Sequence, residues 1–194
     1  MPPGERRAEK FRHVLRLRQP DLTVVLENIH DPHNVSAILR SCDAVGVLRV
    51  ELLYNVEKFP RIGKKSSSSA NKWLDCRRHT SVSECYSTLR GEGLRVYATR
   101  LGGSSASLYD LDLSRPTALV FGNEHRGVSA EAADMADGNF HIPMQGMIQS
   151  LNVSVAAAVS LYEACRQRLG AGIYGKTALP AEELARLYED WIQR

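Results

Sequence analysis

Polar residues that could bind a ligand follow three separate apolar runs of this 194-residue chain. The three clusters contain Asn34 and Arg40, then Gly122, Asn123 and Glu124, and finally Ser150 and Asn152. In each case an apolar strand is expected to lead into a polar segment. Open α/β sheets bind ligands at such junctions, outside the carboxyl ends of their strands. Three junctions of this kind in one short chain indicate a common site.

Each cluster also has a purely structural interpretation. Asn34, Ser150 and Asn152 lie near expected helix starts, where their side chains can cap free amides. Arg40 could form a surface ion pair, and Gly122 could serve a simple turn. Taken one at a time, these structural roles are the simpler interpretation. The repetition of the same junction is what favours a site.

Two familiar nucleotide-binding motifs do not fit. The run Gly-Glu-Gly at 91–93 precedes a strand, whereas a dinucleotide fingerprint opens a helix. The stretch 122–129 has the glycine spacing of a P-loop, but Val128 occupies the place of the phosphate-binding lysine. ATP hydrolysis is therefore not expected.

The overall composition is that of an ordinary globular protein. Apolar residues make up 43% and charged residues 24% of the chain, and the formal net charge is +3. The charge is uneven, since residues 1–20 hold six basic and two acidic side chains and residues 56–79 hold seven and two. Two basic blocks on an otherwise acidic chain indicate either a phosphate-binding surface for nucleic acid or a solvated face that aids solubility.

The cysteines and the N-terminus narrow the possible classes of protein further. Cys42, Cys76, Cys85 and Cys165 include no C-x-x-C pair, so we expect no metal site and four reduced thiols. No run approaches the ~18 apolar residues of a membrane span, and the arginine-rich N-terminus lacks the apolar segment of a signal peptide. We therefore expect a cytoplasmic protein with no membrane contact.

Strands and helices are expected to alternate along the chain. Apolar runs predict strands at 22–26, 47–53, 94–99, 117–121 and 140–142. Apolar periodicity and stop signals predict helices at 4–18, 33–45, 81–90, 129–136, 150–169 and 181–193. Polar loops are expected at 61–71, which we take to be mobile, and at 102–107. This alternation predicts an α/β fold with a parallel sheet and helices on both faces.

Together, the three clusters resemble the three motifs of the SPOUT RNA 2′-O-ribose methyltransferases, specifically the TrmH-like group. The resemblance runs from about Leu22 to Arg168. The third motif, Ser-Leu-Asn-Val-Ser-Val-Ala at 150–156, is highly specific. The second, Phe-Gly-Asn-Glu at 121–124, is strong in combination, and Asn34 and Arg40 have the six-residue spacing of the first.

The resemblance implies a fold and an assembly. In this family the C-terminal part of the α/β fold is tied in a deep trefoil knot, an exception to the rule that folds are unknotted. The enzymes of the family act as homodimers. The SPOUT core would span residues 21–170, between a basic helical extension at 1–20 and a second helical extension at 171–194.

The resemblance also implies site residues by position. The knot binds S-adenosylmethionine, which would be held largely through backbone groups of Thr99, Arg100, Leu101, Gly122, Asn123, Glu124, Ile142, Met144 and Leu151. The catalytic motif residues would be Arg40, Asn34, Glu124, Ser150 and Asn152. The residues expected to contact tRNA phosphates are Arg6, Arg7, Lys10, Arg12, Lys64, Lys65 and Lys72.

The expected reaction is methylation of a ribose 2′-hydroxyl in tRNA. The short helical extensions resemble those of the enzymes that modify guanosine 18 in the D-loop. Arginine side chains do not normally act as bases, since they keep their proton. Arg40 is therefore expected to stabilise the forming alkoxide or to hold the adjacent phosphate. The alternatives are methylation of another RNA, ribosomal or in the tRNA anticodon loop, and a non-catalytic RNA-binding paralogue, against which the intact motif set argues.

Overall fold

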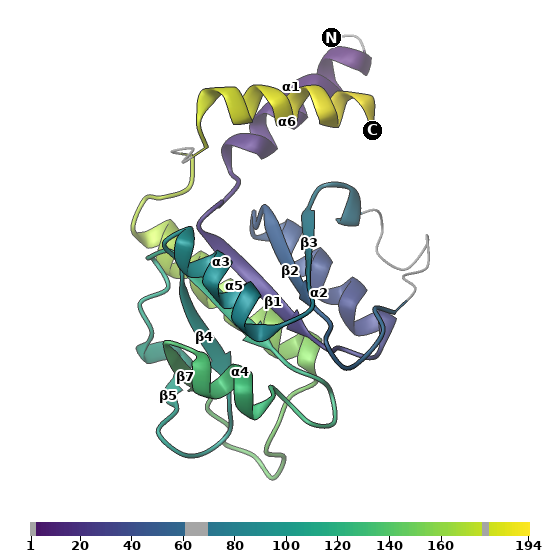
Figure 1. The fold of residues 1–194 in the computed structure, drawn as a ribbon. Helices are drawn as coiled ribbons and strands as arrows, with labels where there is room; N and C mark the ends of the chain where they lie inside the picture. Colours follow the sequence, from purple (N-terminus) through teal and green to yellow (C-terminus); the bar gives the residue numbers. More distant parts are fainter. Residues whose placement is uncertain (1–2, 61–69, 176–178) are drawn as a thin grey trace.

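The computed structural model describes residues 3–60, 70–175 and 179–194 (Figure 1). Within these residues, parallel strands form one sheet in the order β3-β2-β1-β6-β4-β7-β5. The strands are β1 Leu22–Glu27, β2 Arg49–Leu53, β3 Asp75–His79, β4 Arg95–Thr99, β5 Ala106–Ser107, β6 Thr117–Phe121 and β7 Gly138–His141. The helices are α1 Pro3–Arg16, α2 Pro32–Ala44, α3 Val82–Gly91, α4 Ala130–Met135, α5 Val153–Gly170 and α6 Ala181–Gln193. The predicted parallel α/β architecture is confirmed.

The strands bury apolar side chains on both faces, which is why helices cover both sides of the sheet (Figure 1). In β1, Leu22, Val24 and Leu26 join one buried cluster with residues of α2 and α5. Val25 points the other way, into a second cluster with residues of α3 and α4. Each fully buried Val or Leu side chain contributes roughly 1.5–3 kcal/mol to stability. The central strands therefore fix the sheet around which the loops are arranged.

Two strands form where the sequence analysis predicted none. The strand β3, Asp-Cys-Arg-Arg-His, lacks an apolar run, yet it pairs with β2 from Arg49 opposite Asp75 to Leu53 opposite His79. An edge strand accepts charged residues because one of its sides needs no partner. The short β5 pairs with β7 inside the predicted 102–107 loop. Of the predicted 61–71 loop, residues 61–69 lie outside the described residues, and Ala70 opens a 3₁₀ turn.

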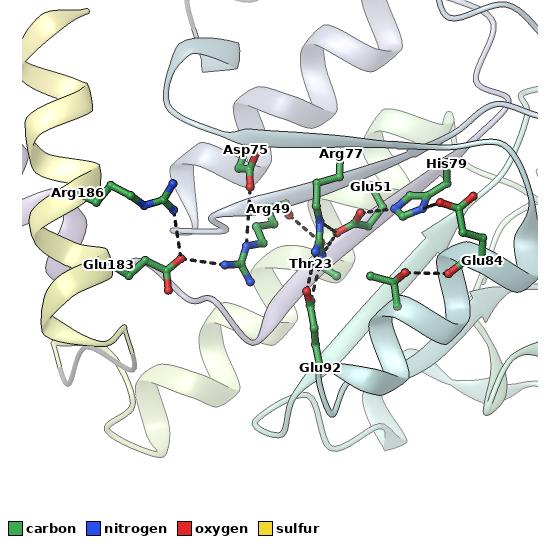
Figure 2. A network of polar contacts seen from close by, with 11 residues as sticks. Thr23, Arg49, Glu51, Asp75, Arg77, His79, Glu84, Glu92, Glu183 and Arg186 are labelled. Atoms are coloured by element: carbon green, nitrogen blue, oxygen red, sulfur yellow. Dashed lines mark hydrogen bonds and ion pairs between the residues drawn. The ribbon is translucent and has the colours of Figure 1, made fainter.

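A buried carboxylate explains how the charged strand β3 is held against β2. Glu51 on β2 is fully buried, and its Oε1 accepts a hydrogen bond from Arg77 Nε at 3.0 Å (Figure 2). Its Oε2 lies 2.7 Å from His79 Nε2. In the same network, Arg49 of β2 pairs with Glu183 of α6 at 2.9 Å (Figure 2). The polar partners on β3 thus compensate a charge that would be costly to bury alone.

The two ends of the chain meet in a separate aromatic cluster. Helices α1 and α6 pack against each other beyond one end of the strands (Figure 1). Phe11, Trp73 and Trp191 form the cluster, with ring centroids 5.1–5.9 Å apart. The segment between α1 and β1 is held by Arg18, which is buried and pairs with Asp43 at 2.5 Å. The predicted terminal helices are confirmed, and each is stabilised by the other.

The described residues contain no helix long and apolar enough to cross a bilayer. In that same part of the chain, no three His, Cys, Asp or Glu side chains gather as metal ligands. The four cysteines are free thiols. Burial raises the pKa of Cys42 above its usual range, so this thiol stays protonated and packs as an apolar side chain.

Candidate active site

A cavity of about 660 Å³ lies at the carboxyl ends of β4, β6 and β7. These strands are neighbours, because β4 pairs with both β6 and β7. The walls come from residues 99–101, 121–128, 140–142, Met144, 149–153 and Ala156. Ligand pockets commonly have volumes of roughly 300–1,000 Å³. The second and third polar clusters of the sequence therefore line one pocket, together with the segment after β4.

The loop after β6 is a tight turn that only glycine allows at its first position. A Cβ on Gly122 would lie closer than 3.0 Å to backbone atoms of Gly127 and Val128. Asn123 closes the turn, since its Oδ1 accepts hydrogen bonds from His125 N at 3.0 Å and Arg126 N at 3.3 Å. The two backbone segments therefore approach each other closely at Gly122, and residues 121–128 of this loop line the cavity.

Glu124 joins the second polar cluster to the first. Its carboxylate accepts hydrogen bonds from His30 N at 2.9 Å, Asp31 N at 3.0 Å and Asn34 Nδ2 at 2.9 Å. Burial works to raise the pKa of Glu124, but these hydrogen bonds outweigh it, and the net shift is downward. Glu124 is therefore a carboxylate at neutral pH and acts as an acceptor at the mouth of the cavity.

The start of α2 explains why Asn34 is free to reach Glu124. Asp31 is the N-cap of this helix, since its side chain accepts a hydrogen bond from His33 N at 2.8 Å. Pro32 follows at the first helical position, where a missing N–H costs nothing. The capping role considered for Asn34 thus belongs to Asp31. Asn34 is itself nearly buried and makes a contact across the chain.

Arg40 does not line the cavity. It lies on α2, six residues after Asn34, which advances a helix by about 9 Å. Its side chain is exposed, and within the described residues its guanidinium makes no hydrogen bond or ion pair. The surface ion pair considered for Arg40 does not form there. A cation is thus held at the surface, free to meet an anionic ligand.

The third cluster combines capping with cavity lining. Asn152 is the N-cap of α5, and its Oδ1 accepts a hydrogen bond from Ser154 N at 2.8 Å. The capping role considered for Asn152 is therefore present. Ser150 and Asn152 are both exposed and both line the cavity. The small Ala156 and Ala157 on the next turn lie against the cavity and the core respectively.

All nine positions predicted to hold a cofactor lie in the cavity wall: Thr99, Arg100, Leu101, Gly122, Asn123, Glu124, Ile142, Met144 and Leu151. Several other wall residues were missed, namely Phe121, His125, Arg126, Gly127, Val128, Phe140, His141, Gln149, Val153 and Ala156. The glycines at 122 and 127 mark the extent of the loop after β6 and could have indicated His125 and Arg126. No pattern in the sequence pointed to Phe140 or Gln149.

The predicted RNA-contacting residues that the structure describes do not line the cavity. Arg6, Arg7, Lys10 and Arg12 are exposed on α1, and Lys72 is exposed after β2. The guanidinium of Arg12 lies over the Tyr188 ring of α6 at 4.7 Å. The positions of Lys64 and Lys65 lie outside the described residues.

A parallel α/β sheet with a ligand cavity at its carboxyl edge, lined by the strand-end loops, defines an α/β enzyme of the kind that binds nucleotide-like cofactors. More specifically, the chain belongs to the SpoU rRNA methylase family, which it matches over residues 21–162. The assignment covers every residue that lines the cavity.

Individual relatives are similar over nearly the whole chain. A tRNA (guanosine(18)-2′-O)-methyltransferase of Thermus thermophilus is 48% identical over 190 residues, covering 98% of this chain and 97% of the relative. The crystal structure of the Aquifex aeolicus TrmH/SpoU tRNA modifying enzyme has a TM-score of 0.91 and 38% identity, covering 98% and 96% of the two chains. The AviRb SpoU methyltransferase of Streptomyces viridochromogenes, solved with AdoMet, has a TM-score of 0.69 and 29% identity over 78% of this chain and 62% of its own.

Proposed function

We propose that this protein methylates the ribose 2′-hydroxyl of guanosine 18 in the D-loop of tRNA, with S-adenosylmethionine as the methyl donor. The observation that carries the proposal is the cavity at the ends of β4, β6 and β7, lined by the loop residues 121–128 and bordered by the Glu124–Asn34 pair. The near full-length similarity to guanosine-18 enzymes supports the substrate.

The cavity fits the proposed cofactor in size and chemistry. Gly122 supports this fit, because it lines the cavity without a side chain and a ligand can therefore approach its main chain closely. Leu101, Ile142 and Leu151 supply apolar wall for an adenine ring. Backbone groups at 99–101, 122–124 and 142–144 would hold its polar edge and the methionine part. When bound, the sulfonium supplies a methyl group that is already activated for transfer.

The protein's part in the reaction is mainly to align the attacking oxygen with the donor. Such alignment can contribute roughly 7–11 kcal/mol to the lowering of a barrier. Glu124 fixes Asn34 and the start of α2 beside the cavity mouth. Arg40, a cation without a partner among the described residues, would stabilise the 2′-oxygen as it loses its proton or hold the neighbouring phosphate. Ser150 and Asn152 would contact the substrate from the opposite wall.

A second part of the proposal concerns the tRNA-binding surface. The arginines and lysine of α1 would bind tRNA phosphates together with Lys72 and the remainder of the 56–79 block. Contacts between α1, α6 and Trp73 support a shared surface, because they hold the two basic segments next to each other. Because salt ions compete with the protein for the phosphates, the affinity for tRNA should fall steeply as ionic strength rises.

The proposal also covers the path of the chain through the core and the assembly of two copies. The core at 21–170 would carry the trefoil knot in its C-terminal part, with extensions at 1–20 and 171–194. The protein would act as a cytoplasmic homodimer. Helix α5 supports a dimer because Val155, Tyr162 and Leu169 are 47%, 57% and 60% exposed at seven-residue spacing, and so form one apolar stripe. Stretching a knotted chain from its termini would give a shorter extended length than an unknotted chain of 194 residues.

The test is methyl transfer from labelled S-adenosylmethionine to purified RNA. Unmodified tRNA transcripts should gain one 2′-O-methylguanosine in the D-loop, identified by nuclease digestion and mass spectrometry. Arg40→Ala should abolish this transfer while the calorimetric Kd for the cofactor stays near that of the wild type.

The other outcomes are equally clear. Label in ribosomal RNA or the anticodon loop would replace the proposed substrate with the alternative RNA. Cofactor binding without transfer to any RNA would favour the non-catalytic paralogue. Near-normal turnover by Arg40→Ala would refute the role assigned to that residue.

A further inference from the structure

The turn that follows β1 has an unusual backbone at a buried polar residue. Asn28 has a φ of +51°, and it is the only non-glycine residue with a positive φ in the described part of the chain. Its side chain is almost fully buried. The left-handed region costs an ordinary L-residue roughly 1–2 kcal/mol, although Asn tolerates it better than most. Such strain persists only where surrounding contacts fix it, and it concentrates at functional sites.

The backbone of Asn28 is fixed from two sides. Its N–H donates to Leu53 O at 2.9 Å, at the end of β2. Its carbonyl oxygen accepts a hydrogen bond from Asn123 Nδ2 at 2.8 Å, in the loop after β6. The neighbouring Glu27 holds the far end of the same loop, because its Oε2 accepts a hydrogen bond from Ser129 N at 2.9 Å. The end of β1 therefore anchors the whole 123–129 segment beside the cavity.

The carboxamide of Asn28 holds a different segment. Its Oδ1 accepts hydrogen bonds from Val56 N at 3.1 Å and Glu57 N at 3.0 Å, and its Nδ2 donates to Asn55 Oδ1 at 2.7 Å. Because only an oxygen can accept from two amides, the orientation of this carboxamide is fixed. The 55–57 segment is where the second basic block of the chain begins. Glu57 then pairs with Arg126 of the cavity wall at 2.8 Å.

The left-handed turn also determines what Glu124 contacts. Two and three residues after Asn28, the amides of His30 and Asp31 both point to the Glu124 carboxylate. A right-handed or extended Asn28 would send the chain elsewhere and turn these amides away. Asn123, which Asn28 binds, is the residue directly before Glu124. The His30 and Asp31 amides that bind the Glu124 carboxylate, and Asn123 beside it, therefore all depend on the conformation of Asn28.

We propose that Asn28 is a positioning residue with two separable effects on the reaction. Its left-handed backbone places the Glu124–Asn34 pair and the cavity loop, and so sets kcat and the affinity for the cofactor. Its carboxamide places the 55–57 segment, and so sets KM for RNA. The inference rests on the proposed function. Wild-type methyl transfer to tRNA, measured first, separates a failure of that function from a failure of this proposal.

Three substitutions separate the two effects. Asn28→Gly keeps the left-handed backbone and removes the carboxamide, so KM for tRNA should rise about tenfold with kcat near that of the wild type. Asn28→Asp keeps an oxygen that accepts from the amides of Val56 and Glu57 and keeps the backbone preference, so it should restore KM, with the Asn55 amide turning to donate. Asn28→Ala lacks both features, so its kcat should fall about tenfold below that of the glycine variant.

Cofactor affinity gives a readout that does not depend on turnover. The calorimetric Kd for S-adenosylmethionine should be unchanged in Asn28→Gly and weakened in Asn28→Ala. Gly93→Ala is the matched control, because Gly93 has a φ of +82° and lies just before β4, at the amino end of a strand whose carboxyl end borders the cavity. This variant carries the same kind of backbone strain away from the site and should keep the wild-type kcat, KM and Kd.

Several results would overturn the proposal. Equal kcat and cofactor Kd in the glycine and alanine variants would remove the role of the backbone. An unchanged tRNA KM in Asn28→Gly, or a raised KM in Asn28→Asp equal to that of the glycine variant, would remove the role of the carboxamide. Melting curves confirm that each variant is folded at the assay temperature. A matching loss of activity in Gly93→Ala would assign the effects to stability alone.

Discussion

The substitution Gly122→Ala tests the central feature of the site, the close backbone approach in the loop after β6. The added Cβ would lie within 3.0 Å of Gly127 C and O and of Val128 N. These obstacles are backbone atoms, so no side chain can turn aside to relieve them. Overpacking of this kind costs typically 1–3 kcal/mol, and we expect the upper end, about 3 kcal/mol.

This strain must appear in one of two measurements. If the loop stays closed, about 3 kcal/mol should lower the melting temperature by roughly 6–12 °C in a chain of this size. If the loop opens to relieve the strain, binding must close it again, and the same energy weakens the cofactor Kd by roughly a hundredfold. Calorimetry on the purified protein, as a thermal scan and as a titration with S-adenosylmethionine, measures both.

Two other glycines serve as controls. Gly127 has a φ of +70° but its Cβ would meet nothing within 4 Å, so Gly127→Ala should show only the cost of the left-handed backbone, about 1–2 kcal/mol. Gly146 has open space and no positive φ, and Gly146→Ala should be neutral. If Gly122→Ala matched Gly146→Ala in both melting temperature and Kd, the reasoning from backbone approach would be refuted.

Three further predictions concern Glu124, Glu51 and Tyr162. Because hydrogen bonds lower the pKa of Glu124, its ionised form stabilises the fold above the usual carboxyl pKa of about 4.3, and this stabilisation is lost as pH falls through the lowered pKa. The difference in urea stability between wild type and Glu124→Gln should therefore shrink over that acid range, and a constant difference would contradict the prediction. Glu51→Ala should destabilise the fold by about 3 kcal/mol in urea titrations, because it leaves Arg77 and His79 without the buried carboxylate. The control Glu84→Ala removes an exposed carboxylate and should change stability by under about 0.5 kcal/mol. Equal effects of the two substitutions would refute a stabilising role for the buried carboxylate. Tyr162→Glu, which places a charge in the exposed α5 stripe of the proposed homodimer, should shift the mass measured by light scattering from dimer to monomer. A variant that remains dimeric would show that the interface lies elsewhere than on α5.

The pattern of apolar runs was enough to predict most elements, because the central strands and the helices that cover them carry that pattern themselves. The strand β1 is fully buried along its length, and the predicted 22–26 run matches it closely. The strand β3 was missed for the opposite reason. Its charged side chains are accommodated by Glu51 on the neighbouring strand, and the sequence does not reveal that pairing.

The same division applies to the site. The sequence by itself determined the types of residue and the junctions that carry them, since glycine, asparagine and glutamate after apolar runs are local features. Only the tertiary structure decided that Glu124 holds Asn34, ninety residues away, and that Asp31 caps α2 in its place. Likewise, nothing local to Asn28 shows that its carbonyl meets Asn123 or that its side chain meets the 55–57 segment. Hydrogen bonds between distant segments depend on how the parallel strands are ordered, and that order is set by the packing of the whole sheet.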